Sequence, residues 1–287
     1  MTTVHTRRRA GLIAVLVALV IALTAVTTAE PVGAASSRCS TSGSWITCER
    51  RTTTIWVGIE PRQVHYQTPL GTPPAGGWPT VVMFQGSLFT AELNWAAASW
   101  YPFGAYHQAK VLQRLLDRGY AVITPEAHIG GATFWDTNNP LYAFNWSAAP
   151  DHRLMLDLFD RIDRGAFGPL NGQKLFATGI SSGGYMTSRV ALEYPSRFKA
   201  VAVQSGSYMT CAGPLCVVPG TLPATHPPTL FLHGVLDPVV PILTMRAYES
   251  SLRRSGIPTK VVTETFATHE WIAAAPTEVP AWFDRYR

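Results

Sequence analysis

The chain has 287 residues, of which 47% are hydrophobic and 14% are charged, which is enough for one sizeable core. It shows no internal repeat and no Ser/Thr/Pro-rich linker, so we expect no appended second module. Its formal charge of +5 includes Arg7, Arg8 and Arg9, and removal of residues 1–29 would leave 20 basic and 18 acidic residues, a balance of +2 that argues against a nucleic-acid partner.

Residues 1–34 are typical of a signal peptide. The basic stretch Arg7–Arg9 precedes an apolar run from Ala10 to Val26, and small residues then allow cleavage after Ala29 or Ala34. The apolar run is shorter than the ~20 residues of a membrane-spanning helix, so cleavage is favoured over membrane anchoring. We therefore expect a secreted, extracellular protein with no stable membrane anchor after cleavage.

The four cysteines fall into two pairs that are local in the sequence. An even number of cysteines in an exported protein favours disulfides. We expect Cys39 to pair with Cys48 in a hairpin near the mature N-terminus, and Cys211 to pair with Cys216 across a small loop. Zinc binding is the alternative, but the spacings are not Cys-x-x-Cys and no histidine lies at ligand spacing, so no metal is expected.

Predicted strands and helices alternate along the rest of the chain. The expected strands cover residues 44–49, 52–60, 80–84, 120–124, 174–178, 198–204, 229–233 and 260–266. The expected helices cover residues 106–118, 151–164, 185–194, 241–255 and 279–287. Such alternation indicates an α/β fold, with a mostly parallel central sheet and helices on both faces, in a single domain over residues 35–287.

The segment from Gly179 to Gly184, Gly-Ile-Ser-Ser-Gly-Gly, lies between an expected strand and an expected helix. This arrangement is the nucleophile elbow of the α/β-hydrolase fold, in which a tight turn exposes a reactive serine, here Ser181. Gly179 and Gly183 flank the serine because a Cβ at either position would collide with the neighbouring strand and helix. The alternative for Ser181 is an ordinary helix N-cap, a role in which serine is common.

A nucleophilic serine in this fold is followed along the chain by an acid and then by a histidine. Asp237 and Asp284 are the aspartates that follow Ser181, and His269 is the histidine that follows Asp237. Asp237 and His269 each come after an expected strand, at the sheet edge where open α/β sheets place their sites. We predict a triad of Ser181, Asp237 and His269, with His233 as a structural residue. A glutamate remains open as the acid: Glu193, Glu249 or Glu264.

Acyl transfer at such a serine needs two N–H donors for the developing oxyanion. One is expected to be the backbone N–H of Ser182, the residue after the nucleophile. The other is expected in the loop that follows the strand at residues 80–84, where Gly86 allows the chain to turn and the N–H of Ser87 is our choice.

Two predicted surface loops, at residues 88–103 and 134–146, are rich in aromatic residues. A single aromatic side chain is more often core packing than binding, but clusters in loops indicate an apolar cleft or an exposed apolar patch. Such walls suit a fatty or water-insoluble ester. The residues expected to contact that substrate are Trp95, Trp100, Trp135 and Trp146.

The segment around Ser181, from Thr178 to Ser188, resembles the elbow of the extracellular medium-chain-length polyhydroxyalkanoate depolymerases. The segment Leu236–Pro241 and the spacing of Ser181, Asp237 and His269 are similar to that family as well. The resemblance covers most of the mature chain. It implies an α/β-hydrolase that hydrolyses polyesters of the poly(3-hydroxyoctanoate) type, with these three residues as its triad.

We therefore predict a secreted serine esterase that acts through an acyl-enzyme on medium-chain-length poly(3-hydroxyalkanoates), without a metal or other cofactor. Its partner is expected to be a water-insoluble polyester or another apolar ester. A feruloyl or acetylxylan-type esterase, or a short-chain polyester esterase, is the alternative, because such enzymes resemble this elbow too. A non-catalytic secreted surface protein is a remote alternative, against which a complete triad argues.

Overall fold

The computed structural model of the chain describes residues 1–2, 37–211 and 216–287. The expected signal peptide at residues 1–34 and its cleavage sites lie outside this part, apart from the first two residues. The described residues from Ser37 onward belong to one compact unit. Within the described residues, no helix is both long and apolar enough to cross a membrane.

The central sheet contains the strands β3 (Arg51–Val57), β4 (Glu60–Gln67), β5 (Trp78–Phe84), β7 (Ala121–Pro125), β8 (Leu170–Ile180), β9 (Phe198–Gln204), β10 (Thr229–Gly234) and β11 (Thr259–Glu264). Their order across the sheet is β11-β10-β9-β8-β5-β7-β4-β3. The six strands from β11 to β7 pair in parallel, and β4 pairs antiparallel with both β7 and β3. Strands β5 and β7 are buried along their whole length, as strands covered on both faces must be.

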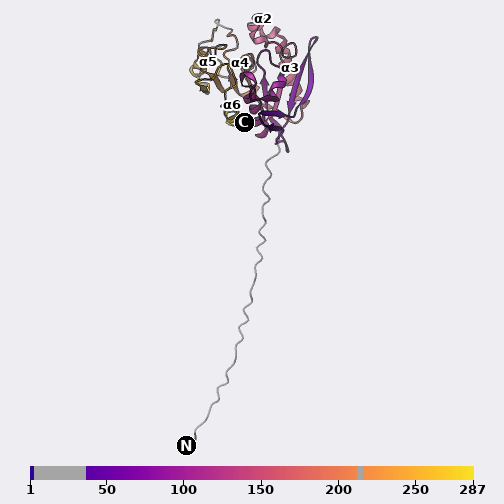
Figure 1. The fold of residues 1–287 in the computed structure, drawn as a ribbon, viewed down its shortest axis with the longest axis vertical. Helices are drawn as coiled ribbons and strands as arrows, with labels where there is room; N and C mark the ends of the chain where they lie inside the picture. Colours follow the sequence, from indigo (N-terminus) through magenta and orange to yellow (C-terminus); the bar gives the residue numbers. More distant parts are fainter. Residues whose placement is uncertain (3–36, 212–215) are drawn as a thin grey trace. The chain divides into compact units, whose positions relative to one another are not determined.

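The longer helices that cover the sheet are α1 (Ala105–Asp117), α3 (Pro150–Asp163), α4 (Ser182–Glu193), α5 (Ile242–Arg254) and α6 (Ala275–Asp284). Helices α1 and α6 pack in one hydrophobic cluster with Val81, and α3 and α4 pack in another with Val82. Because successive strand residues point to opposite faces, the two clusters lie on opposite faces of the sheet. Helix α5 packs against Phe231 of β10 in a third cluster, and α4 lies between α5 and α3 in Figure 1. The mostly parallel sheet with helices on both faces is therefore confirmed.

A small second sheet at the start of the described domain contains β1 (Cys39–Ser42), β2 (Trp45–Cys48) and β6 (Ala96–Ala98). Strands β1 and β2 form a hairpin in which Cys39 and Cys48 face each other and are joined by a disulfide. A second disulfide joins Cys211 to Cys216. Both expected cysteine pairs are therefore present.

The expected strand at residues 52–60 is replaced by the hairpin of β3 and β4. The chain reverses at Gly58, whose φ of +64° suits glycine, and Val57 then pairs with Glu60. Strand β4 was not expected as a separate strand. Its sequence, Glu-Pro-Arg-Gln-Val-His-Tyr-Gln, has few apolar residues, and the strand is held by pairing with β7. The remaining elements in the loops are α2 (Pro140–Ala143) and the short turns η1 (Ala91–Asn94), η2 (Pro102–Gly104), η3 (Asp136–Asn138) and η4 (Trp146–Ala148).

Candidate active site

Ser181 occupies the sharp turn between β8 and α4, so the expected strand–turn–helix is present. Its φ of 56° and ψ of −122° lie in a region that non-glycine residues rarely adopt. The turn is tightly enclosed, because a Cβ on Gly179 would lie 2.5 Å from the Gly183 carbonyl oxygen, and one on Gly183 would lie 2.3 Å from the Phe84 carbonyl oxygen. The two glycines therefore allow the helix to start directly against the sheet.

Asp237 and His269 lie in the loops after β10 and β11, and their side chains are in contact. His269 Nδ1 donates a hydrogen bond of 2.8 Å to Asp237 Oδ2. Asp237 Oδ1 accepts the backbone N–H groups of Val239 at 2.9 Å and of Val240 at 2.8 Å. Burial by itself would raise the pKa of Asp237, but the bonds from His269 and the two N–H groups outweigh it and lower that pKa. The carboxylate is thus held ionised beside the imidazole.

His233 lies next to this pair but is fully enclosed. Its Nε2–H donates to the Val240 carbonyl at 2.8 Å and lies 3.4 Å from Asp237 Oδ2. Burial lowers the pKa of His233, so the ring is neutral and packs behind the carboxylate. It does not line the cavity described below, which agrees with a structural role.

The three glutamates that the sequence leaves open as the acid are engaged elsewhere. Glu193 forms an ion pair with Arg189, and Glu249 forms one with Arg253. Glu264 accepts the backbone N–H groups of residues 273 and 274. Among the described residues, Asp237 is the acid whose side chain bonds to His269.

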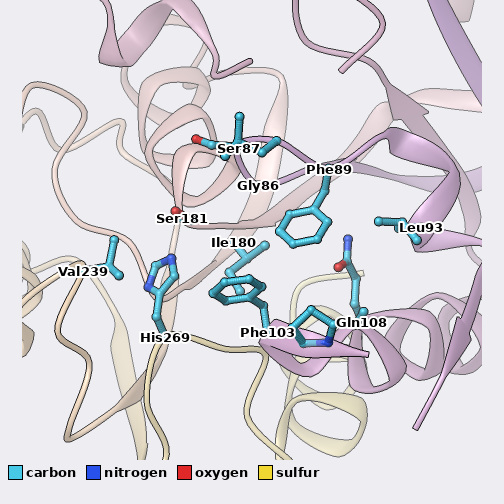
Figure 2. A pocket seen from close by; sticks show the side chains of 13 residues that line it. Gly86, Ser87, Phe89, Leu93, Phe103, Gln108, Ile180, Ser181, Val239 and His269 are labelled. Carbon is cyan, nitrogen blue, oxygen red and sulfur yellow. The ribbon is translucent and has the colours of Figure 1, made fainter. Parts of the chain in front are cut away.

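Ser181 and His269 line one cavity of about 280 Å³ with mostly apolar walls. Figure 2 shows them at one end and Leu93 and Gln108 at the other, with the rings of Phe89 and Phe103 between. No direct hydrogen bond joins Ser181 Oγ to the His269 ring within the described part of the chain, and such catalytic bonds commonly tighten only around a substrate. The cavity can hold an apolar acyl or alkyl chain beside the serine. Its lining residues are Gly86, Ser87, Leu88, Phe89, Leu93, Pro102, Phe103, Ala105, Gln108, Ile180, Ser181, Val239 and His269.

The two segments expected to supply oxyanion donors meet at Ser181. Ser87 and Gly86 follow β5 and line the cavity together with Ser181. Ser182 is the first residue of α4, where backbone N–H groups lack partners within the helix. Its side-chain hydroxyl points elsewhere, because it accepts the Trp135 backbone N–H at 2.9 Å and donates to Asn138 Oδ1 at 2.9 Å.

The structure corrects the tryptophan predictions. Trp95, Trp135 and Trp146 are buried in the hydrophobic clusters and do not line the cavity. Their indole N–H groups donate to partners inside the protein: Thr124 Oγ1, the Gln85 carbonyl and the Tyr194 hydroxyl. The three tryptophans are core residues because their loops pack against the sheet and its helices. Trp100 is exposed and packs on Trp45 outside the cavity.

The aromatic wall of the cavity comes instead from Phe89 and Phe103, within the first of the two expected loops. Of the five non-glycine residues with positive φ in the described chain, three line the cavity: Leu88, Phe103 and Ser181. Strained backbone of this kind gathers at functional sites. Leu93 and Gln108 were not expected at the site, since no sequence pattern reveals which residues of a loop or of α1 face a distant serine.

A cluster of charged side chains joins the segment after β7 to β4 and to the start of α3. His128 Nε2 bonds to Asp136 at 2.9 Å, and Asp151 bonds to Arg62 at 3.0 Å. Ligand atoms of His128, Asp136 and Asp151 lie within 4.8 Å of one another, a spacing that could hold a metal. The Arg62 guanidinium supplies the positive charge, and also lies 3.2 Å from Glu60, so these residues form an ion-pair network. Burial and the charge of Asp136 raise the pKa of Asp151.

A family model described as the dienelactone hydrolase family matches residues 68–280 of the chain. Over 259 residues the chain is 49% identical to a protein of Pseudomonas fluorescens named poly(3-hydroxyoctanoate) depolymerase. That match covers 88% of this chain and 92% of the relative.

Two solved structures show the same fold. A putative dienelactone hydrolase from Klebsiella pneumoniae subsp. pneumoniae MGH 78578 has a TM-score of 0.54 and 20% identity, and the match covers 83% of this chain and 99% of that one. A dienelactone hydrolase-like promiscuous phosphotriesterase from metagenomic libraries has a TM-score of 0.60 and 18% identity, with coverages of 85% and 99%. The chain therefore belongs to the dienelactone hydrolase family, within the α/β-hydrolase superfamily, and is a carboxylic ester hydrolase.

Proposed function

We propose that this chain is a secreted serine esterase that hydrolyses the ester bonds of medium-chain-length poly(3-hydroxyalkanoates) through Ser181, His269 and Asp237. The observation that carries the proposal is the 2.8 Å bond from His269 to Asp237, with His269 and Ser181 on the wall of one apolar cavity. A bonded His–Asp pair beside a strained serine at an elbow supports nucleophilic catalysis.

The reaction follows from these positions. His269 Nε2 takes the proton of Ser181 Oγ as Oγ attacks the ester carbonyl carbon, and Asp237 stabilises the imidazolium that forms. The tetrahedral intermediate collapses, the bond from carbon to the leaving oxygen breaks, and that oxygen takes the proton from His269. Water then attacks the acyl-enzyme with His269 again as base, which releases the acid and restores Ser181.

The developing oxyanion is stabilised by the backbone N–H groups of Ser182 and Ser87. Ser182 contributes an N–H of the first turn of α4, where the helix dipole also favours negative charge. Loss of one such donor typically lowers kcat by about 10²- to 10³-fold. The meeting of Gly86, Ser87 and Ser181 at one cavity supports this assignment.

The cavity and its rim support an apolar substrate. Phe89, Leu93 and Phe103 offer an apolar surface to the alkyl part of an acyl group. At the rim, Leu88 is 78% exposed and Val239 is 58% exposed, although both line the cavity. Exposed apolar side chains around a reactive serine suit contact with a water-insoluble ester. The 49% identical relative, named poly(3-hydroxyoctanoate) depolymerase, supports this polymer as the substrate.

Secretion is supported by two independent features. The segment before the described domain has the pattern of a signal peptide, with cleavage after Ala29 or Ala34. The two disulfides, Cys39–Cys48 and Cys211–Cys216, suit an oxidising compartment. N-terminal sequencing of protein from culture medium tests both the export and the cleavage site, and a full-length intracellular product would contradict them.

The catalytic proposal is tested with a serine-reactive phosphonate probe. Wild-type protein should incorporate one phosphonate per chain, on the peptide that contains Ser181, and lose its esterase activity. The S181A variant should neither react nor hydrolyse p-nitrophenyl octanoate. Normal activity of S181A would place the nucleophile elsewhere.

The substrate proposal is tested on latices of a long-side-chain and a short-side-chain polyester, beside a feruloylated sugar. Clearing of the long-side-chain latex with a preference for C8 over C2 p-nitrophenyl esters is the expected result. Preference for C2, or for the feruloyl ester, without clearing of that latex would favour the feruloyl or acetyl esterase alternative.

Polymer adsorption is proposed to use the exposed Trp100, and β3 provides a matched control. Trp100 is 62% exposed and Trp56 on β3 is 61% exposed. W100A should weaken adsorption to the latex while hydrolysis of a soluble ester stays unchanged, and W56A should adsorb as wild type. Equal adsorption by all three proteins would remove Trp100 from the docking surface.

A further inference from the structure

Trp135 contacts both segments that carry the proposed oxyanion donors. Its backbone N–H donates to Ser182 Oγ at 2.9 Å, at the start of α4. Its indole N–H donates to the Gln85 carbonyl at 3.0 Å, in the loop after β5. The indole ring is fully buried and packs edge-on against Phe84, with ring centroids 5.2 Å apart. One residue thus links the nucleophile helix to the oxyanion loop, through its backbone at Ser182 and through its indole at Gln85.

The Gln85 carbonyl lies in close contact with the start of α4. It packs so closely on α4 that a Cβ on Gly183 would lie 2.4 Å from its oxygen. Because the peptide unit is planar, the direction of this carbonyl also sets the direction of the Gly86 N–H and the path of the chain into Ser87. The Gln85 side chain is itself tied to the neighbouring loop, since Nε2 donates to the Gly131 carbonyl at 2.9 Å. A shift at Gln85 is therefore transmitted to the oxyanion loop.

Trp135 is held in place by the charge network behind it. The next residue, Asp136, donates its backbone N–H to Asp151 Oδ2 at 2.6 Å, and the Asp151 N–H donates back to Asp136 Oδ2 at 2.9 Å. Asp136 also bonds to His128. These reciprocal bonds fix the loop to the N-terminal end of α3. The backbone beside Trp135 is therefore held in place, and with it the donors of its two hydrogen bonds.

We propose that Trp135 is a positioning residue that sets the separation of the Ser182 and Ser87 N–H groups and thereby the strength of the oxyanion hole. The inference rests on the proposed function. Neither hydrogen bond of Trp135 touches the substrate, so the residue acts through Ser182 and Gln85. A misplacement of about 1 Å in catalytic groups costs on the order of 10²-fold in rate.

The test uses two variants that each remove one of the two bonds. W135F keeps a large ring in the core but deletes the indole N–H that binds Gln85. S182A keeps the backbone N–H of residue 182 but deletes the hydroxyl that binds Trp135 and Asn138. For p-nitrophenyl octanoate, each variant should lower kcat by about 10- to 100-fold with KM within twofold of wild type, because oxyanion stabilisation acts in the transition state. Both should still titrate one serine with the phosphonate.

Trp146 provides a matched control for core damage. It lies in the same hydrophobic cluster as Trp135, and its indole N–H donates to the Tyr194 hydroxyl at 3.0 Å. W146F therefore loses a similar buried bond at the C-terminal end of α4, and that bond involves neither Ser182 nor Gln85. Its Tm should fall as much as that of W135F, while its kcat stays within twofold of wild type.

The double variant W135F/S182A distinguishes a shared role from two separate ones. If both residues act through one link, the kcat of the double variant should be close to that of the single variant with the lower kcat. A kcat of W135F or S182A within twofold of wild type would overturn the proposal, and S182A decides alone if W135F does not fold. Failure of the proposed function is recognised separately. In that case wild-type protein would not react with the phosphonate, and S181A would keep the wild-type activity.

Discussion

His269 Nδ1 donates a 2.8 Å hydrogen bond to Asp237 Oδ2, while the other oxygen of that carboxylate accepts two backbone N–H groups. The carboxylate is thereby held in one orientation, and it holds the imidazole in the tautomer whose Nε2 is free to accept a proton. D237N should keep the fold, since an amide oxygen can still accept the backbone N–H groups, but lower kcat on the order of 10⁴-fold through the wrong tautomer. Steady-state kinetics with circular dichroism checks this. Near-normal activity would mean that another acid serves His269.

Gly183 should not tolerate a side chain. A Cβ there would lie 2.3 Å from the Phe84 carbonyl oxygen, with backbone atoms that cannot move aside. G183A should therefore lower the free energy of unfolding by about 3 kcal/mol or more. Gly220 is the control, because no atom of the described residues, its two chain neighbours aside, lies within 4 Å of its Cβ position, and G220A should change that free energy by less than about 0.5 kcal/mol. Urea unfolding of the three proteins measures both effects.

Filling the far end of the cavity should shorten the preferred acyl chain. Leu93 lines the cavity away from Ser181, as Figure 2 shows. Four extra methylenes in a C8 ester contribute up to ~3 kcal/mol of apolar burial over a C4 ester. L93W should remove much of that gain, so kcat/KM for the octanoate should fall about tenfold or more relative to the butyrate. L156W, on the exposed side of α3, should keep the wild-type ratio.

His226 should make stability depend on pH. Burial lowers the pKa of His226 to about 4, and the neutral ring bonds to the Pro227 carbonyl and the Tyr248 hydroxyl. Because the folded-state pKa lies below the unfolded value of about 6.5, this contribution is present above pH 6.5 and is lost as the pH falls towards 4, by about 3 kcal/mol at most. H226Q should show a shallower loss of unfolding free energy over that range. Equal slopes for both proteins would count against this role.

The Cys39–Cys48 disulfide should stabilise the protein measurably. It closes a loop with a sequence separation of 9 residues, for which chain entropy gives at most about 3 kcal/mol. The double variant C39A/C48A should lower the Tm, whereas C211A/C216A, which opens a loop with a separation of 5, should lower it less. Denatured wild-type protein should contain no titratable thiol. Two or more free thiols would contradict both pairings.

The sequence alone predicted the parts of this protein that depend on local geometry. The elbow could be found because Gly179 and Gly183 are required by contacts within a few residues of Ser181 and by the adjacent strand. Asp237 and His269 could be predicted as triad candidates because parallel strands bring their carboxyl ends to one edge, which leaves few eligible residues after each strand. The alternation of strands and helices predicted the sheet, and the local cysteine pairs predicted the disulfides.

The tertiary structure decided which aromatic residues face the cavity. Trp135 and Phe103 both lie in aromatic loops, yet Trp135 is buried against Phe84 and Phe103 lines the cavity. The difference depends on backbone turns, such as the φ of 56° at Phe103, and on partners far away in the sequence, such as Gln85 for the Trp135 indole. The β3–β4 hairpin likewise depends on pairing of β4 with β7. Side-chain direction in a loop is set by long-range packing, which composition and spacing do not encode.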